Sequence, residues 1–225
     1  MKGLSLKTRV QLILARNELL ENIQSVLQDK LGLEVEMNLA PMALAEKFLT
    51  PEQQRIGSVI VDMGAGSTSV SVYYKGGLLG LRVIPLGAQN ITYDLTTTEL
   101  HISMNEAERI KINSAEAISD TDDDREVEVR TADHLTSKKL PLLKINRFVE
   151  ARATEIIDNV KAFVFELLPD KKIPGGVVIT GGGSKLAKIR ELIATSMNTE
   201  VEFAGNTHDI GGSSAFFRDK PEWHV

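Results

Sequence analysis

The sequence has no cysteine, and aromatic residues make up only 5% of its 225 positions. No disulfide can form, which fits a reducing compartment. The apolar runs are all well short of the roughly 18 residues that a membrane-spanning helix needs, and the N-terminal residues MKGLSLKTRV contain no apolar stretch of the signal-peptide type. These absences predict a soluble, cytoplasmic protein.

Basic residues are also outnumbered by acidic ones. The 26 lysines and arginines against 31 aspartates and glutamates leave a net charge of −5, which argues against nucleic acid as a partner. The 42% hydrophobic and 25% charged residues are ordinary for a globular protein and exclude disorder, collagen and coiled coil as the dominant state. The length fits one large domain or two small ones and is enough for a proper core. The motifs must therefore indicate the function.

The hydrophobic periodicity predicts helices separated by strands. Residues 8–40 have the pattern of a strand, a helix capped by Asn17, and a second strand. Pro41 suits the first turn of a short helix over 41–49, because its missing N–H group would be unpaired there. Further helices are expected at about 88–100, 104–116, 141–168 and 184–197.

The strand pattern is clearest between Gly57 and Pro85, where two glycine-containing turns separate apolar or alternating stretches. Three consecutive antiparallel strands are the simplest interpretation. The polar, acidic stretch 119–140 contains a possible strand at 126–130 and has the character of a small subdomain. A further buried strand is expected at 176–180.

A glycine-containing segment, DMGAGS, follows the first of these strands. A dinucleotide fingerprint would need a third glycine and then a helix, but Ser69 stands at that position and a strand follows. The pattern instead favours a hairpin that grips phosphate, in which Gly64 and Gly66 let the backbone approach an anion. Asp62, at the strand end, would face a metal-bound phosphate or its attacking water. An ordinary hairpin turn is the alternative.

A second glycine segment, GGVVITGGGSKL, begins at Gly175 and runs from a buried strand through three glycines into the helix expected from residue 184. The free N–H groups and positive dipole of that helix would face a ligand above the loop, and the glycines leave room for a flat ring or a ribose. This is not a Walker loop, because no Gly-Lys-Ser/Thr sequence occurs. A tight strand-to-helix turn without a ligand is the alternative.

Together, the two segments and the stretches between them resemble a known family. The order of elements is similar to that in the second half of the actin-like ATPases. The residues of the motifs themselves are most similar to those of the FtsA family of bacterial cell-division proteins. The matching stretches lie between about residues 57 and 205: VIVDMGAGSTSVSVY, GLLGLRVIPLGAQNITYDL, NEAERIK, FVEARATEIIDNV and GGVVITGGGSKL.

The resemblance implies an α/β, actin-like ATPase (ribonuclease H-like) fold, with a mixed sheet flanked by helices and a small IIB subdomain. Residues 1–50 would be the end of domain I and the crossing segment. Residues 51–118 and 170–225 would form subdomain IIA, and residues 119–169 subdomain IIB. No second Asp-x-Gly turn precedes Gly57. We therefore expect a truncated or shortened relative, with at most weak ATPase activity in a full-length parent and none in this chain alone.

The resemblance also implies a site for ATP and Mg²⁺. Asp62 would be the catalytic residue and would reach Mg²⁺ only through water. The residues implied to bind the nucleotide are Gly64, Gly66 and Ser67 for phosphate, Glu108 and Lys111 for ribose, and Gly181, Gly182, Gly183 and Ser184 for adenosine. The i, i+3 spacing of Glu108 and Lys111 places both on one helix face, and a surface ion pair is the alternative for them.

By resemblance, the function is that of a self-associating adaptor that links the division protein FtsZ to the inner face of the cell membrane at the septum. The C-terminal peptide of FtsZ would bind the long helix beside Arg147, Arg152 and Lys161, unless that face is merely solvated. The membrane would be reached only through a C-terminal segment absent here. Alternatives with the same fold are a pilus-assembly or cell-shape scaffold and a fragment of a sugar- or acetate-kinase-type phosphotransferase.

Overall fold

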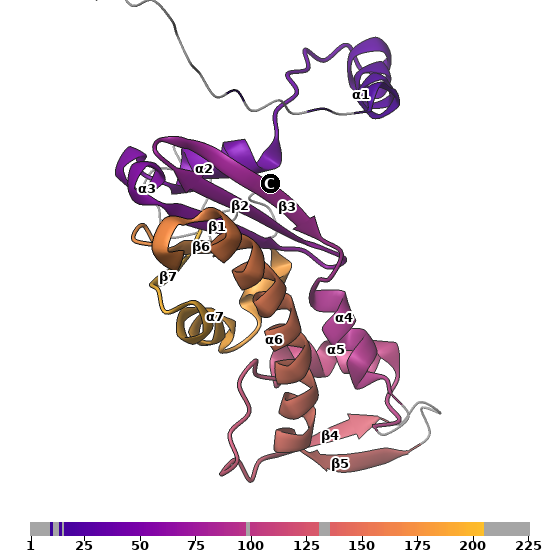
Figure 1. Ribbon diagram of the computed structural model, residues 1–225. Helices are drawn as coiled ribbons and strands as arrows, with labels where there is room; N and C mark the ends of the chain where they lie inside the picture. The colour runs from indigo at the N-terminus through magenta and orange to yellow at the C-terminus, as the bar shows by residue number, and fades with distance from the viewer. Residues whose placement is uncertain (1–9, 11–13, 15, 98–99, 131–135, 205–225) are drawn as a thin grey trace, which may run out of the picture. The chain divides into compact units, whose positions relative to one another are not determined.

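The computed structural model describes residues 10, 14, 16–97, 100–130 and 136–204 (Figure 1). The chain divides into two units, residues 1–38 and residues 39–225. Among the described helices, none is both long and apolar enough to cross a bilayer.

In the described part of the first unit, the helix α1 (Asn17–Gln24) is continued by a π-helical stretch over Ser25–Lys30. Asn17 is the first helical residue and not the cap, since Arg16 precedes the helix without a side-chain cap. The strand expected after the helix is also wrong. Residues 32–39 have no strand ladder, and the amide of Leu33 instead donates to the carbonyl of Leu27 (3.0 Å) at the helix end. The strand expected before Asn17 lies mostly outside the described residues.

A five-stranded mixed sheet organises the second unit, in the order β3-β2-β1-β6-β7. The strands are β1 (Ser58–Met63), β2 (Thr68–Tyr74), β3 (Gly77–Ile84), β6 (Val177–Thr180) and β7 (Val201–Phe203). The first three are antiparallel, as predicted, and β6 and β7 continue the sheet in parallel with β1.

Strand β1 is buried on both faces because its apolar side chains alternate between two cores. Val59, Val61 and Met63 join the larger core, which includes residues of α6 (Leu142–Leu167) and α7 (Ile189–Met197). Ile60 joins a smaller core with α2 (Ala40–Phe48) on the opposite face. Helices therefore cover both faces of the sheet, as the family resemblance implies (Figure 1).

The helices agree with the predictions in position more than in length. Helix α3 (Pro51–Ile56) has a capping box and follows α2 directly. Helix α4 (Ala88–Leu95) ends five residues before the predicted end. The hydroxyl of Thr96 bonds to the carbonyl of Tyr93 (2.7 Å), a local bond that competes with further helix. Helix α5 (Met104–Asn113) also ends early.

The expected helix over 184–197 is wrong in its first half. Gly182–Lys185 form a short 3₁₀ turn, and α7 starts only at Ile189. Lys188 adopts the left-handed conformation (φ +60°), which interrupts any continuous helix. The positive end of α7 is therefore not placed directly behind the three glycines.

The acidic stretch does contain the predicted strand, β4 (Glu126–Arg130), paired with an unpredicted strand, β5 (Ser137–Pro141). This antiparallel pair forms a second sheet, separate from the five-stranded one. Helix α6 begins directly after β5 and runs from the small sheet to β2 and β3 (Figure 1). It therefore packs against both sheets of the second unit.

Candidate nucleotide-binding site

A cavity of about 370 Å³ lies where four segments meet. Strands β1 and β6 are parallel neighbours, so their C-terminal ends, and the turns that follow them, emerge at the same edge of the sheet. Helices α4 and α5 supply the other side. The lining residues are Ala65, Ala88, Ile91, Glu108, Lys111, Ile112, Gly182, Gly183, Lys185 and Leu186.

The hairpin turn after β1 is held against the first residues of α4. The amides of Ala88 and Gln89 donate to the carbonyls of Gly64 (3.0 Å) and Ala65 (2.8 Å). These N–H groups at the start of a helix would otherwise lack a partner. A side chain on Gly87 would collide with the carbonyl of Ala65, so only glycine allows this approach.

The predicted phosphate residues lie in this hairpin turn. The amide of Gly64 closes the turn by donating to the carbonyl of Ser67 (2.9 Å). Gly66 is exposed, and no atom lies within 4 Å of where its Cβ would be. Neither glycine has a positive φ. Only Gly66 therefore leaves open space at the turn, because a Cβ on Gly64 would lie 3.0 Å from the carbonyl oxygen of Ser67, a tight contact with the backbone of the turn itself.

Asp62 lies at the end of β1, opposite Ser69 of β2 and Thr180 of β6. It is partly buried, and burial raises the pKa of its carboxyl. A Cβ on Gly181 would lie only 2.5 Å from its Oδ1 atom. The carboxyl group therefore lies beside the glycine loop, next to the cavity lining without belonging to it.

The three glycines after β6 are not equivalent. Gly181 has φ +83°, and its Cβ would lie 2.5 Å from the carbonyl oxygen of Met63. The Cβ of Gly183 would lie 2.9 Å from the Cβ of Met63. Gly182 has nothing within 4 Å and lines the cavity. The fold therefore requires the outer two glycines, whereas only the middle one is free to serve a ligand.

Ser184 faces the protein interior. It is fully buried, and its hydroxyl and amide both bond to the carbonyl of Gly181 (2.8 and 3.1 Å). These contacts close the turn behind the glycines. Its position supports the loop, and its role toward a nucleotide stays a prediction.

On the helix side, Glu108 and Lys111 form the predicted i, i+3 pair, with 2.7 Å between Nζ and Oε2. Thr92 of α4 joins them, because its hydroxyl donates to Glu108 Oε2 (2.5 Å) and accepts from Lys111 Nζ (2.8 Å). Burial acts to raise the pKa of Glu108, but the hydrogen bonds from Lys111 and Thr92 outweigh it and hold that pKa below its ordinary value. Sequence reasoning missed Thr92, which belongs to no glycine motif.

The apolar lining was also not predicted. Ile91 is buried in the core beneath the cavity, whereas Ile112 is 68% exposed at its rim. Leu186 lies on the side of the glycine loop. Helical periodicity marks such residues only as apolar, and their meeting depends on how the helices pack.

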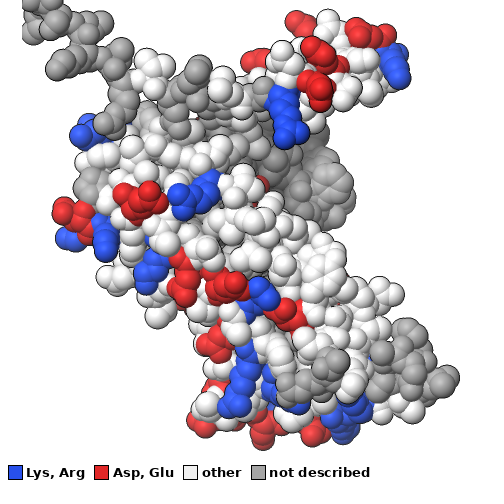
Figure 2. Space-filling model, turned by 45° about the vertical axis from the view of Figure 1, so that its right-hand side comes forward, with Lys and Arg blue, Asp and Glu red and all other residues white. Residues whose placement is uncertain are grey.

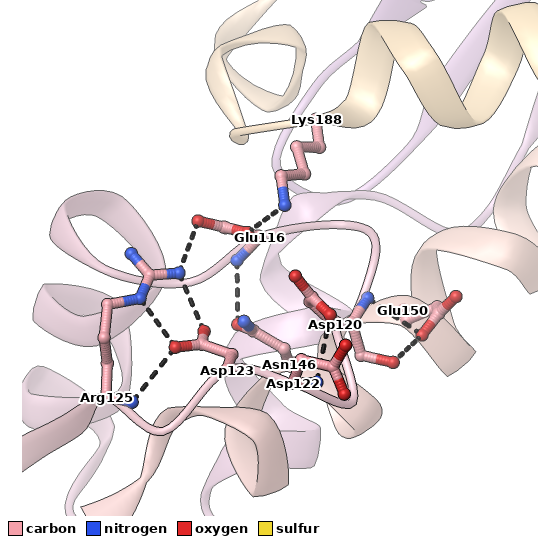
Figure 3. Close-up of polar contacts among 9 residues, drawn as sticks. Glu116, Asp120, Asp122, Asp123, Arg125, Asn146, Glu150 and Lys188 are labelled. Atoms are coloured by element: carbon pink, nitrogen blue, oxygen red, sulfur yellow. Dashed lines mark hydrogen bonds and ion pairs between the residues drawn. The ribbon is translucent and has the colours of Figure 1, made fainter.

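A second polar cluster ties the end of the glycine loop to its surroundings (Figure 3). Glu116 pairs with Lys188 (2.6 Å) and Arg125 (2.9 Å), and Arg125 also pairs with Asp123 (2.7 Å). The backbone of Glu116 donates to Asn146 of α6 (2.9 Å). The pKa of Glu116 is held below its ordinary value, mainly by the hydrogen bond from Lys188 and next by the hydrogen bond from Arg125. The cluster therefore joins the loop before α7, the start of β4 and α6.

The three predicted partner residues on α6 do not form one surface. Arg147 is exposed, whereas Arg152 pairs with Asp94 of α4 (2.6 Å) and also with Glu155. Lys161 lies 5.8 Å from the ring centre of Phe165. At about 100° per residue, Arg152 points roughly 140° away from Arg147 around the helix. Figure 2 shows basic and acidic side chains interspersed on the face that it presents.

Comparison with known proteins gives the family. A family model described as cell division protein FtsA matches residues 59–215. The chain belongs to the FtsA family. Curated relatives with that description are 34% identical in Porphyromonas gingivalis, 30% in Neisseria meningitidis and 30% in Bacillus subtilis. These matches cover 80%, 95% and 91% of this chain but only 38%, 52% and 46% of the relatives, so the chain spans about half of their length or less.

Solved structures confirm the actin-like fold predicted from the sequence. MreB 5 of Spiroplasma citri bound to AMPPNP is similar with a TM-score of 0.69 and 17% identity, over 85% of this chain and 61% of that one. A chain of the PilM-PilN type IV pilus biogenesis complex is similar with a TM-score of 0.62 and 18% identity, over 92% and 56%. At these identities the likeness shows the fold alone, and the family is shown by the FtsA match.

Proposed function

We propose that this FtsA-family chain supplies one wall of a site for ATP. The observation that carries the proposal is the meeting of the hairpin turn, the start of α4, the face of α5 and the glycine loop around one cavity of about 370 Å³. The family resemblance links the hairpin turn to phosphate, α5 to ribose and the glycine loop to adenosine. These three segments all contribute residues to the lining of this cavity. Cavities of this size are typical of small-molecule sites.

The chemistry of the lining fits an adenosine nucleotide. Ile91, Ile112 and Leu186 offer apolar contact to a base, and Gly182 leaves room for it. Glu108 supplies a carboxylate for ribose hydroxyls. No described residue accepts a hydrogen bond from the amides of residues 65–67, so these amides are available to phosphate oxygens. Mg²⁺, reached from Asp62 through water, would neutralise phosphate charge when bound.

Nucleotide titration of the 225-residue chain tests the proposal. We expect saturable binding of ATP in magnesium, weakened at least tenfold by Gly182→Val because the new side chain enters the cavity. Gly77→Val is the matched control, since Gly77 begins β3 away from the cavity and also has nothing within 4 Å of its Cβ position. Both variants should keep a native circular dichroism spectrum. Absence of saturable binding to the unmodified chain would contradict the proposal.

We also propose the adaptor role of the family for this chain: self-association, and attachment of FtsZ to the membrane at the division site. The C-terminal peptide of FtsZ would bind near the start of α6, where Arg147 is exposed and Lys138 and Lys139 lie on the adjoining β5. Charge complementarity would attract an acidic, partly apolar peptide. Arg152 contributes less to this surface, because Asp94 and Glu155 already neutralise its charge.

Titration of a labelled FtsZ tail peptide onto the chain tests this second part. Micromolar binding should weaken with Arg147→Glu and should be little changed by Lys161→Glu. The two positions are 14 residues apart, which corresponds to about 21 Å along the helix and makes Lys161 a matched control. Equal weakening by both changes, or no binding at any accessible concentration, would remove this assignment.

A further inference from the structure

The ammonium group of Lys111 has no proton left for a ligand. It donates to three oxygens: the carbonyl of Ala88 (3.1 Å), the hydroxyl of Thr92 (2.8 Å) and Oε2 of Glu108 (2.7 Å). A lysine ammonium has three N–H donors. The side chain is only 11% exposed. Although Lys111 lines the cavity, its polar end is therefore used entirely by the protein.

Glu108 differs from Lys111 in this respect. Its Oε2 atom accepts from Thr92 and from Lys111, whereas the described residues provide no donor for Oε1. The side chain is 44% exposed and lines the cavity. A carboxylate oxygen accepts up to two hydrogen bonds. The free Oε1 atom is therefore the polar group of this wall that can receive a ligand hydroxyl.

Thr92 connects the carboxylate of Glu108 to the first turn of α4. It is 1% exposed, and its single hydroxyl proton is directed to Glu108 Oε2 at 2.5 Å, since the other acceptor, the carbonyl of Ala88, lies at 3.4 Å. Thr92 lies one helical turn after Ala88, whose amide is bonded to the hairpin turn. The position of the hairpin is thus transmitted to Glu108 through the first turn of α4.

We propose that Thr92 and Lys111 are positioning residues, which hold Oε2 of Glu108 so that its Oε1 atom receives the hydroxyl groups of a nucleotide sugar. This inference rests on the proposed nucleotide function. It assigns sugar recognition to one oxygen atom and gives Lys111 no direct contact with the ligand. Two protein donors on one oxygen restrict the rotation of the carboxylate, which lowers the entropy lost when a ligand binds.

If the proposal is right, loss of the Thr92 hydroxyl weakens the binding of ligands that have sugar hydroxyls more than the binding of ligands that lack them. Thr92→Val keeps the branched shape of the side chain but removes the hydroxyl, and Thr92→Ser keeps the hydroxyl. Thr96→Val is the control at the residue that follows α4, because among the described residues the hydroxyl of Thr96 bonds only to the carbonyl of Tyr93. If Thr92→Val does not fold, Thr92→Ala removes the same hydroxyl without adding a methyl group.

The affinities of the chain and its variants for ATP and for 2′,3′-dideoxy-ATP test the proposal. We expect Thr92→Val to weaken ATP about fivefold or more, with less than a twofold change for the dideoxy analogue. Thr92→Ser and Thr96→Val should behave as the unmodified chain does. One hydrogen bond is typically worth a change of this size. Equal weakening of both nucleotides by Thr92→Val, or no weakening of either, would overturn the proposal.

A second measurement needs no nucleotide. Carbon-13 NMR titration of the Glu108 carboxyl should show a higher pKa in Thr92→Val than in the unmodified chain or in Thr92→Ser, because one hydrogen bond to the charged form is lost. If the chain does not bind ATP, the proposed function fails, and this titration still decides whether Thr92 holds the carboxylate. An unchanged pKa of Glu108 in Thr92→Val would reject the positioning role.

Discussion

The cavity wall that comes from the sheet consists mainly of backbone, whereas the wall that comes from α5 consists of side chains. On the sheet side, Gly181 and Gly183 are packed against Met63, and Gly182 alone is open. On the helix side, Glu108 and Lys111 are held by hydrogen bonds to each other and to α4. The first wall is shaped by steric exclusion, and the second by pairing of polar groups.

This difference indicates how each wall tolerates change. A side chain added at a packed glycine must displace backbone, which the surrounding strands resist. A polar side chain removed from the helix wall leaves its partners unpaired, at a smaller and more local free-energy cost. The sheet wall should therefore affect folding most, and the helix wall should affect recognition and titration most.

The largest expected effect tests the sheet wall. Gly181→Ala should lower the free energy of unfolding by about 3 kcal/mol or more, because a non-glycine residue is strained at φ +83° and its Cβ would lie 2.5 Å from the backbone of Met63. Urea denaturation measures the change. Gly182→Ala, the matched control, should stay within about 0.5 kcal/mol of the unmodified chain. Equal losses in the two variants would contradict the distinction between these glycines.

Lys111→Met tests the helix wall in the same experiment. It removes one ammonium and leaves Glu108 and the buried Thr92 without a shared donor, so we expect a loss of about 1–3 kcal/mol. Carboxyl NMR should also show a raised pKa of Glu108, because its charged form loses a hydrogen bond. Lys139→Met is the control, since the side chain of Lys139 is 72% exposed. A loss no greater than in this control would place Lys111 on a tolerant surface.

Glu116→Gln examines the polar cluster at the end of the glycine loop. Because the pKa of Glu116 is lowered on folding, its contribution to stability is complete above its ordinary value of 4.5 and is lost as the pH falls through the folded value. The variant should lose about 1 kcal/mol at neutral pH and less at lower pH.

Urea denaturation at several pH values checks this expectation. Glu126→Gln, at a side chain that is 52% exposed, is the control and should change the free energy of unfolding little. If Glu116→Gln lowers the free energy of unfolding equally at neutral and acid pH, the ion pairs of Glu116 do not cause the effect.

The smallest effect on stability is expected at Asp62, the ionisable side chain beside the sheet wall. Its pKa is raised by burial, so ionisation reduces stability as the pH rises above its ordinary value of 3.8. Asp62→Asn should therefore be as stable as the unmodified chain at neutral pH, or more so, while ATP binding in magnesium weakens. Thermal unfolding and nucleotide titration measure the two quantities. A destabilised variant with unchanged ATP affinity would assign Asp62 to folding.

The elements with strong local patterns could be predicted from the sequence. The hairpin strands alternate or are wholly apolar, and α6 extends over 26 residues with a continuous buried stripe. The first half of the helix expected over 184–197 could not be predicted, because a left-handed Lys188 has no local signal. Strand β5 was missed for a similar reason, since SKKLP becomes a strand only by pairing with β4.

The sequence by itself determined the kind of site: glycines after two buried strands, an acid at the end of the first, and a Glu–Lys pair at helical spacing. Local chain geometry is enough for such features, because turns need glycine and helix faces repeat every 3–4 residues. Only the tertiary structure decided that, of the three glycines after β6, Gly182 alone is open, that Ser184 is turned inward, and that Thr92 meets Glu108. These roles depend on which atoms lie within about 4 Å across elements distant in the sequence, and packing alone sets those distances.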